Sequence, residues 1–249
     1  MDDQQLLRYS RQIMLPQVDV AGQDKLLATR TLVIGAGGLG SPAAMYLAAA
    51  GIGHIVIADP DTVELSNLQR QILHNSTDLG KPKTASAAET LQAINPDVQV
   101  TTIPERLSGE QLASEVQQAD IVLDCSDNFN TRFAVNAACV AHSTPLVSGA
   151  AVRMEGQVAV FLPGTPDSPC YACLYKQGED ADQTCAENGV LSPVVGIIGS
   201  LQALEAIKVI LSLGSNLCGR LLVFDGLQHD WRSLKLTRDP DCPVCGLSD

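Results

Sequence analysis

Short apolar runs alternate with amphipathic segments over roughly the first 150 residues of the chain. Such runs, when Gly, Asp or Pro bounds them, are typical of buried strands, and the segments between them have helical spacing. This alternation predicts a mostly parallel sheet with helices on both faces, a Rossmann-like doubly wound α/β fold. The predicted elements are, in chain order, helices at 3–14 and 22–28, a strand at 31–34, a helix at 40–50, a strand at 54–58, a helix at 83–94, a strand at 98–103, a helix at 109–118, a strand at 121–124, a helix at 130–141 and a strand at 146–148.

The pattern changes after Ala150. Residues 152–162 alternate like a strand of a half-exposed antiparallel sheet, and a long helix is predicted at 192–213. Two paired strands are predicted at 221–225 and 231–236. We therefore expect one domain, 1–249, made of N-terminal helices (1–29), a nucleotide-binding half (30–150) and a smaller, partly antiparallel half (151–249).

Composition narrows the class of protein. The chain has 249 residues, 45% of them hydrophobic, which is ample for a large core, and its net charge of -12 disfavours a nucleic-acid surface. The N-terminus has neither a basic nor an apolar segment of the kind that a signal peptide needs. Gly51 and Gly53 interrupt one apolar stretch, and Gln202, Glu205 and Lys208 interrupt another. We therefore expect no membrane span and a cytoplasmic location.

Four of the eight cysteines form two C-x-x-C pairs, Cys170 with Cys173 and Cys242 with Cys245. Two such pairs can supply a tetrahedral shell of four thiolates, which is typical of a structural Zn²⁺ site. A redox-active dithiol is the alternative. The zinc site would fasten the C-terminal segment to the loop that follows the sheet.

A glycine loop follows the first predicted strand. Gly35, Gly37 and Gly40 match the G-x-G-x-x-G pattern of dinucleotide sites, and Asp59 lies where a ribose-binding carboxylate belongs. The pattern alone indicates an NAD site. The segment 66–71, Ser-Asn-Leu-Gln-Arg-Gln, changes this interpretation, because the Arg70 cation and nearby donors suit an enzyme that cleaves a triphosphate.

The full set of motifs resembles the bacterial adenylyltransferases related to ubiquitin-activating enzymes. It comprises the glycine loop, Asp59, the segment 66–71, Lys83, the segment 124–128 (Asp-Cys-Ser-Asp-Asn) and the two C-x-x-C pairs. The likeness extends from about residue 6 to residue 246. It implies that ATP and Mg²⁺ are used to adenylate the C-terminal glycine carboxylate of a small ubiquitin-like sulfur carrier protein, with release of pyrophosphate. It also implies a homodimer, and a cysteine desulfurase or rhodanese as sulfur donor.

The resemblance also assigns roles to residues. Gly38 would lie under the nucleotide, Asp59 would bind the ribose, and Asp127 would be the Mg²⁺ ligand. The expected nucleotide-binding residues are Gly38, Asp59, Asp61, Ser66, Asn67, Arg70, Gln71, Lys83, Asp127 and Asn128. Plainer alternatives are a surface role for Lys83 and a helix N-cap role for Asp127. Asp124 is expected to buttress its strand end rather than to contact a ligand.

Two further residues are candidate catalytic groups. Arg11 would reach the triphosphate of the neighbouring subunit, although a solvated helix charge at Arg11 or Arg8 is the alternative. Cys185 lies in a polar loop and is either an acceptor of the activated acyl group or a bystander.

The sequence leaves alternatives open for both the biosynthetic pathway and the class of function. Residues 148–157 resemble the molybdopterin branch of the family, whereas 224–226 and 231–234 resemble the thiamine branch. The molybdopterin branch is our first expectation. From other classes, an NAD-dependent oxidoreductase with structural zinc would leave Arg70, Lys83 and Asp127 without a role. A non-catalytic adaptor would be expected to lack those phosphate-binding residues.

Overall fold

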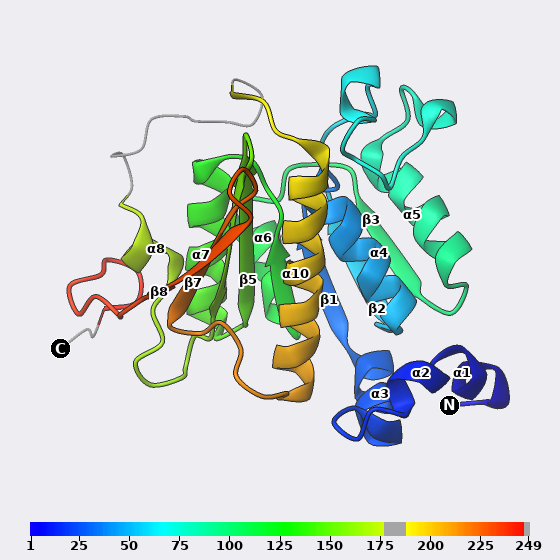
Figure 1. Cartoon of the computed structure of the whole chain (residues 1–249), viewed down its shortest axis with the longest axis horizontal. Coiled ribbons are helices and arrows are strands. Elements are labelled where there is room, and N and C mark those ends of the chain that lie inside the picture. Colours follow the sequence, from blue (N-terminus) through cyan, green and yellow to red (C-terminus); the bar gives the residue numbers. More distant parts are fainter. Residues whose placement is uncertain (177–187, 247–249) are drawn as a thin grey trace.

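The computed structural model describes residues 1–176 and 188–246 (Figure 1). Its strands are β1 (Arg30–Ile34), β2 (His54–Ala58), β3 (Gln99–Ile103), β4 (Ile121–Asp124), β5 (Leu146–Val152), β6 (Glu155–Phe161), β7 (Arg220–Asp225) and β8 (Asp230–Lys235). Its helices are α1 (Asp3–Arg8), α2 (Ser10–Ile13), α3 (Asp19–Ala28), α4 (Gly40–Ala50), α5 (Lys83–Ile94), α6 (Gly109–Gln118), α7 (Phe129–His142), α8 (Tyr171–Leu174) and α10 (Ser192–Leu211), with short 3-10 turns η1 (Leu65–Asn67) and η2 (Ser76–Asp78).

The eight described strands form one sheet in the order β3-β2-β1-β4-β5-β6-β7-β8. Strands β3 to β5 pair in parallel, and β6, β7 and β8 continue the sheet with antiparallel pairs. The predicted fold class is therefore confirmed: a doubly wound, mostly parallel sheet with an antiparallel extension. The chain order reverses between β1 and β4, and ligands of such sheets bind at the carboxyl ends of the strands around that point.

Helices cover both faces of the sheet because alternate strand residues point to opposite sides. Val33 packs into a core with α4, α5 and α10. Its neighbours Leu32 and Ile34 pack on the opposite face, into a core with α6 and α7. Burial on both faces explains why these strands are continuous apolar runs rather than alternating patterns.

The long helix α10 has a mean hydropathy of 1.8 over its most apolar window and is the one described helix that could cross a membrane by length and composition. Half of that window is buried inside the protein. The helix packs on α4, β5 and β6, where Val194, Val195 and Ile198 are buried. These contacts are those of a core helix.

The predicted N-terminal helix 3–14 is wrong as one element, because it breaks into α1 and α2 at Tyr9. The Tyr9 side chain is buried and its hydroxyl accepts a hydrogen bond of 2.9 Å from Asn95 Nδ2. The next helix begins at Asp19, three residues before the predicted start. The Asp19 carboxylate accepts from the N–H groups of Ala21 and Gly22 and so caps the helix.

The predicted antiparallel strand at 152–162 is confirmed as β6, but its predicted start and its half-exposed character are wrong. Strand β5 continues to Val152, a turn at Arg153 and Met154 follows, and β6 returns antiparallel to it. Strand β6 is largely buried rather than half-exposed. The reason is α10: a Cβ at Gly156 would lie 2.3 Å from Ile198 Cγ1, so the helix packs directly on the strand.

Two glycines of α10 test this packing. A Cβ at Gly199 would lie 2.3 Å from the carbonyl oxygen of Leu39 and 2.6 Å from Pro42 Cγ, so we expect Gly199→Ala to cost about 1–3 kcal/mol in unfolding free energy. Gly196 has open space at that position, so Gly196→Ala should be neutral or stabilise by up to about 1 kcal/mol. Urea unfolding of both variants measures the difference, and equal effects would contradict the close helix contact.

Candidate functional site

A cavity of about 650 Å³ lies at the carboxyl edge of the parallel strands. One part of its wall is polar and comes from the segments after β1, β2, β3 and β4. The other part comes mainly from β5, β6 and the start of α10. The chemistry-bearing residues of the wall are Asp59, Asp61, Arg70, Gln71, Lys83, Glu105, Arg106, Ser126, Asp127, Asn128, Thr131, Arg132, Glu155, Gln157, Tyr171 and Tyr175.

The glycine loop between β1 and α4 leaves no room for side chains at two positions. Gly35 has a φ of +99°, and a Cβ there would lie 2.8 Å from the carbonyl oxygen of Cys125. A Cβ at Gly40 would lie 1.9 Å from the carbonyl oxygen of Gly35. Gly37 and Gly38 line the cavity, so the backbone can approach a ligand there.

Two side chains hold the Ala36 peptide of this loop. Asp59 Oδ2 accepts a hydrogen bond of 2.7 Å from the Ala36 N–H, and His74 Nε2 lies 2.9 Å from the Ala36 carbonyl oxygen. A carbonyl oxygen only accepts, so His74 Nε2 carries the hydrogen, and Nδ1 lies 2.8 Å from Ser86 Oγ. Burial lowers the pKa of His74. The loop is therefore fixed on both sides of Ala36.

Lys83 is buried at the start of α5, so the alternative of a plain surface lysine is wrong. Its Nζ lies 2.8 Å from Asp61 Oδ2 and 4.0 Å from Asp59 Oδ1. Arg70 donates to the carbonyl oxygen of Ser66 and also lines the cavity. Two cations and two carboxylates thus lie together beside the glycine loop.

Asp127 follows β4 and is exposed to the cavity. The suggested N-cap role for Asp127 is wrong: the cap of α7 is Asn128, whose Oδ1 accepts from the N–H of Thr131 at 2.9 Å. The Asp127 carboxylate has only a 3.4 Å contact with Asn128 Nδ2 among the hydrogen bonds of the described residues. It therefore suits a cation such as Mg²⁺, which prefers carboxylate oxygens together with ligand oxygens and water.

Gln71 has an unsatisfied acceptor in the cavity wall. Its side chain is buried, and Oε1 has no hydrogen-bond partner within the described residues. A buried acceptor left alone is costly, but Oε1 has almost no accessible surface, so a donor from a bound molecule would reach it only after the side chain turns. Ser66 and Asn67, the other two predicted nucleotide-binding residues of the segment 66–71, do not line the cavity, and both side chains form hydrogen bonds with Glu64.

A buried polar network that no sequence motif indicates extends from the cavity wall into the protein. Arg132 Nη1 lies 3.7 Å from Asp124 Oδ2 and donates to the carbonyl oxygen of Gly149 at 2.8 Å. Burial opposes the Arg132 charge, but the Asp124 carboxylate, Tyr171 and Tyr175 together outweigh burial, and the pKa of Arg132 is raised. Gln202 of α10 donates to the Asp124 carbonyl oxygen at 2.8 Å. Asp124 thus buttresses the strand end, as predicted.

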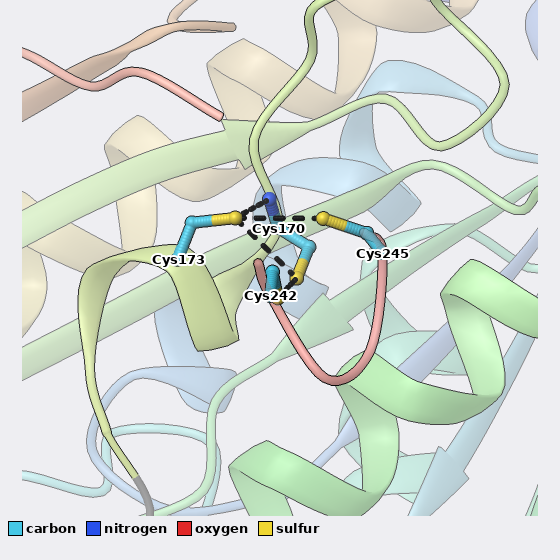
Figure 2. A group of neighbouring side chains, drawn as sticks. All are labelled: Cys170, Cys173, Cys242 and Cys245. Atoms are coloured by element: carbon cyan, nitrogen blue, oxygen red, sulfur yellow. Dashed lines mark hydrogen bonds between the residues drawn. The ribbon is translucent and has the colours of Figure 1, made fainter. Parts of the chain in front are cut away.

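The four cysteines of the C-x-x-C pairs come together on the far side of the sheet extension from the N-terminal helices (Figures 1 and 2). Their sulfur atoms all lie within 4.8 Å of one another, with 3.4 Å between Cys173 and Cys245 and 3.7 Å between Cys170 and Cys242. Tetrahedral zinc with Zn–S bonds of about 2.3 Å spaces its sulfurs at about 3.8 Å. The cluster therefore fits zinc, and it leaves no position for a substrate.

Cysteines outside the cluster lie in environments of a different kind. Cys125 lines the cavity, but burial raises its pKa, and its Sγ lies 3.6 Å from Gln202 Oε1. Burial likewise raises the pKa of Cys139. Neither is suited to act as a thiolate. Cys185 lies outside the described residues.

Arg11 is not part of this cavity. It lies on α2, which Gln12 fastens to the carbonyl oxygen of Ala50 at the end of α4. Helix α2 therefore lies at the amino ends of the parallel strands (Figure 1), whereas the cavity lies at their carboxyl ends. Arg11 is exposed and has no hydrogen bond or ion pair within residues 1–176 and 188–246.

The fold and the glycine-loop cavity define a nucleotide-binding α/β protein. Residues 9–244 match the model of the ThiF family, so the chain belongs to that family. It is 49% identical to the sulfur carrier protein ThiS adenylyltransferase of Escherichia coli K12, over 100% of this chain and 98% of that one. It is 51% identical to the molybdopterin-synthase adenylyltransferase of Haemophilus influenzae, over 92% of this chain and 94% of that one. Among solved structures, Escherichia coli MccB with ATP superposes with a TM-score of 0.82 at 28% identity, covering 96% of this chain and 73% of that one.

Asp59 offers a test of the electrostatics. Burial raises its pKa, although Lys83 and two backbone N–H groups act to lower it. Folding therefore favours the protonated carboxyl, and the ionised form lowers the unfolding free energy at neutral pH. We define the margin as the unfolding free energy of Asp59→Asn minus that of the parent, and we expect it to shrink as the pH falls through the raised pKa of Asp59. The margin also contains a pH-independent loss, because the single oxygen of Asn cannot accept from both the Ala36 and the Asp61 N–H groups. Urea unfolding across this pH range measures the margin, and a margin that grows in acid would contradict the assignment.

Proposed function

We propose that this protein is an ATP-dependent adenylyltransferase that activates the C-terminal glycine carboxylate of a ubiquitin-like sulfur carrier as an acyl-adenylate. One observation carries the proposal: a single cavity joins a glycine loop, the Arg70 and Lys83 cations and the Asp127 carboxylate to a lobe whose wall includes small apolar residues. The first part suits a nucleoside triphosphate and the second a thin peptide tail. Relatives from both branches of the family, similar over nearly the whole chain, carry adenylyltransferase names.

In this proposal the nucleotide lies across the switch point. Gly38 lies beneath it, and Asp59 accepts from a ribose hydroxyl. Gln71 Oε1, which lacks a donor in the described residues, takes a further hydrogen bond from the nucleotide once its side chain turns. Asp61 keeps Lys83 in position, and Asn128 holds the start of α7 so that Asp127 faces the cavity. Ser66 and Asn67 are weaker candidates for phosphate binding than Arg70 and Lys83, because they would contact a phosphate only if their segment moved.

The reaction brings like charges together. A carboxylate oxygen of the carrier forms a bond to the α-phosphorus, and the bond from that phosphorus to the bridging oxygen breaks as pyrophosphate leaves. Arg70 and Lys83 reduce the repulsion at the phosphate oxygens. Asp127 would hold Mg²⁺, which when bound neutralises further charge on the polyphosphate.

The proposed tail-binding lobe includes the small residues Ala150, Ala151, Gly156, Val190 and Val195 beside the larger Gln157, Tyr171 and Tyr175. The small residues leave room for an extended chain that ends in glycines, so a Gly-Gly tail is the proposed substrate. We favour the carrier of molybdopterin biosynthesis, with the thiamine-pathway carrier as the alternative. Relatives of both branches match at 49% and 51% identity, so one chain could serve both carriers.

We also propose a homodimer in which Arg11 reaches the active site of the partner. Arg11 is exposed and lies at the edge of the sheet opposite its own cavity. The packed pair α4 and α10 exposes an apolar face, with Tyr46 at 58%, Ile197 at 37% and Leu204 at 50% exposure. A second copy would cover such a face.

The remaining roles are also proposals. Zinc in the four-cysteine cluster would be structural. Cys185, if it accepts the acyl group, acts after the adenylate forms. A cysteine desulfurase or rhodanese would supply sulfur. A reducing compartment such as the cytoplasm would keep the cluster thiols available to the metal. The whole of 1–249 would act as one unit, with 151–249 supplying the carrier-binding and zinc half.

The proposed reaction is measured by ATP–pyrophosphate exchange with each carrier supplied in turn. We expect exchange that depends on carrier and Mg²⁺, and a loss of at least about 100-fold in Asp127→Ala, because the polyphosphate charge is then uncompensated. Glu110→Ala is the matched control: it removes an exposed carboxylate from the first turn of α6, away from the cavity.

Two outcomes would contradict the proposal. One is thermal stabilisation by NAD with none by ATP, which would favour an oxidoreductase. The other is undiminished exchange in folded Asp127→Ala protein. The carrier that supports the faster exchange identifies the branch.

Metal analysis tests the cysteine cluster. We expect one zinc per chain, and we expect Cys173→Ser to lose it and to unfold with a cost of about 3 kcal/mol, or roughly 6–12 °C in Tm. Cys218→Ser is the control, since Cys218 lies outside the cluster. Zinc-free native protein with four titratable cluster thiols would favour the redox dithiol.

A further inference from the structure

Arg106 brings to the cavity a cation that the phosphate-binding motifs do not include. It lies three residues after the end of β3 and lines the cavity with an exposed side chain. Its guanidinium has no hydrogen bond or ion pair within the described parts of the chain. The neighbouring carboxylate does not neutralise it, because Glu105 Oε1 accepts from Gln111 Nε2 at 2.8 Å. An unpaired arginine on a cavity wall is free to contact a ligand.

The sheet order fixes which part of a ligand Arg106 can meet. Along the carboxyl edge, β4 leads to Asp127, β1 to the glycine loop, β2 to Asp59 and β3 to Arg106. Strands are about 4.8 Å apart, so the end of β3 is roughly 14 Å from the end of β4. If Asp127 and the glycine loop hold phosphates and Asp59 holds the ribose, the base lies on the β3 side.

The surroundings of Arg106 suit a flat, uncharged ring better than a phosphate. Asp59 directly follows β2, the strand between β3 and β1, so its carboxylate lies between Arg106 and the glycine loop along this end of the sheet and would repel an anion there. Leu107, buried beside Arg106, adds an apolar surface to the wall. A planar guanidinium over an aromatic face contributes about 0.5–2 kcal/mol.

We propose that Arg106 stacks its guanidinium on the adenine ring of the bound nucleotide and thereby sets the affinity for the base. This inference rests on the proposed function, because it requires ATP in the cavity. Stacking makes the same contribution in the ground state and in the transition state. Arg106 is therefore a binding residue that affects KM for ATP and not kcat.

The test compares ATP with inorganic tripolyphosphate, which has no base, as ligands of the full-length protein. Arg106→Ala should weaken ATP binding about 3- to 30-fold and leave tripolyphosphate binding unchanged. Arg106→Phe removes the charge but keeps a stacking surface, so it should recover most of the ATP affinity. Lys25→Ala is the charge-matched control. Lys25 is an exposed cation of α3, which precedes β1 and so lies at the amino end of the strands, away from the cavity.

The alternative results are distinct. Equal losses for ATP and tripolyphosphate, with no recovery in Arg106→Phe, would mean that Arg106 pairs with phosphate and would overturn the proposal. Unchanged ATP binding in Arg106→Ala would overturn it as well. If the parent protein bound no ATP, the proposed function itself would fail. A changed kcat at saturating ATP would also contradict a role confined to the base.

Discussion

The candidate site depends on the two hydrogen bonds that hold the Ala36 peptide. Asp59 accepts from its N–H at 2.7 Å, and His74 donates to its carbonyl oxygen. Neither bond could form if the glycine loop had side chains at Gly35 or Gly40, because their Cβ atoms would overlap backbone oxygens. One consequence is that Asp59 is not free to move: its other oxygen accepts from the Asp61 N–H at 2.9 Å. The glycine loop, the candidate ribose-binding residue Asp59 and the ion pair between Lys83 and Asp61 therefore form a single preorganised unit.

A second constraint joins the parallel and antiparallel parts of the sheet. Gln202 is fully buried in α10 and donates to the carbonyl oxygens of Asp124 on β4 and Val147 on β5. Gly149 is required beside it, since a Cβ there would lie 2.4 Å from the Gln202 amide. Arg132 completes the network from the other face of the sheet. The sides of the cavity proposed for the nucleotide and for the carrier tail thus share one rigid wall, as a reaction between two separately bound substrates would require.

The sequence predicted those features that depend on local patterns. The parallel strands were predictable because burial on both faces makes them continuous apolar runs, and the cysteine cluster because each pair forms within one turn. Residues that meet only through the tertiary fold were missed: Arg106 has no motif of its own, and Arg132 looks like any helix arginine until Asp124 is placed beside it. The sequence suggested Asp127 as N-cap of this helix, but α7 begins at Phe129, so the cap is the residue directly before it, Asn128. Tyr9 breaks the first helix through a contact with Asn95, 86 residues away, which no local pattern records.

Charge is distributed differently in the cavity and in the whole chain. The chain has a net charge of -12, yet four cations, Arg70, Lys83, Arg106 and Arg132, face five carboxylates among the residues that line the cavity. Screening limits the surface field to roughly 8–10 Å at physiological salt, so an anionic nucleotide senses mainly this nearly balanced local set. In the proposed function, binding of a polyphosphate would then depend on placement, with Arg70 and Lys83 beside phosphate oxygens and the Asp127 carboxylate beside Mg²⁺. A carboxylate substrate would add one more negative charge at the same point. Local pairing of this kind would explain how an acidic protein holds two anions in contact while its surface carries the same sign of charge.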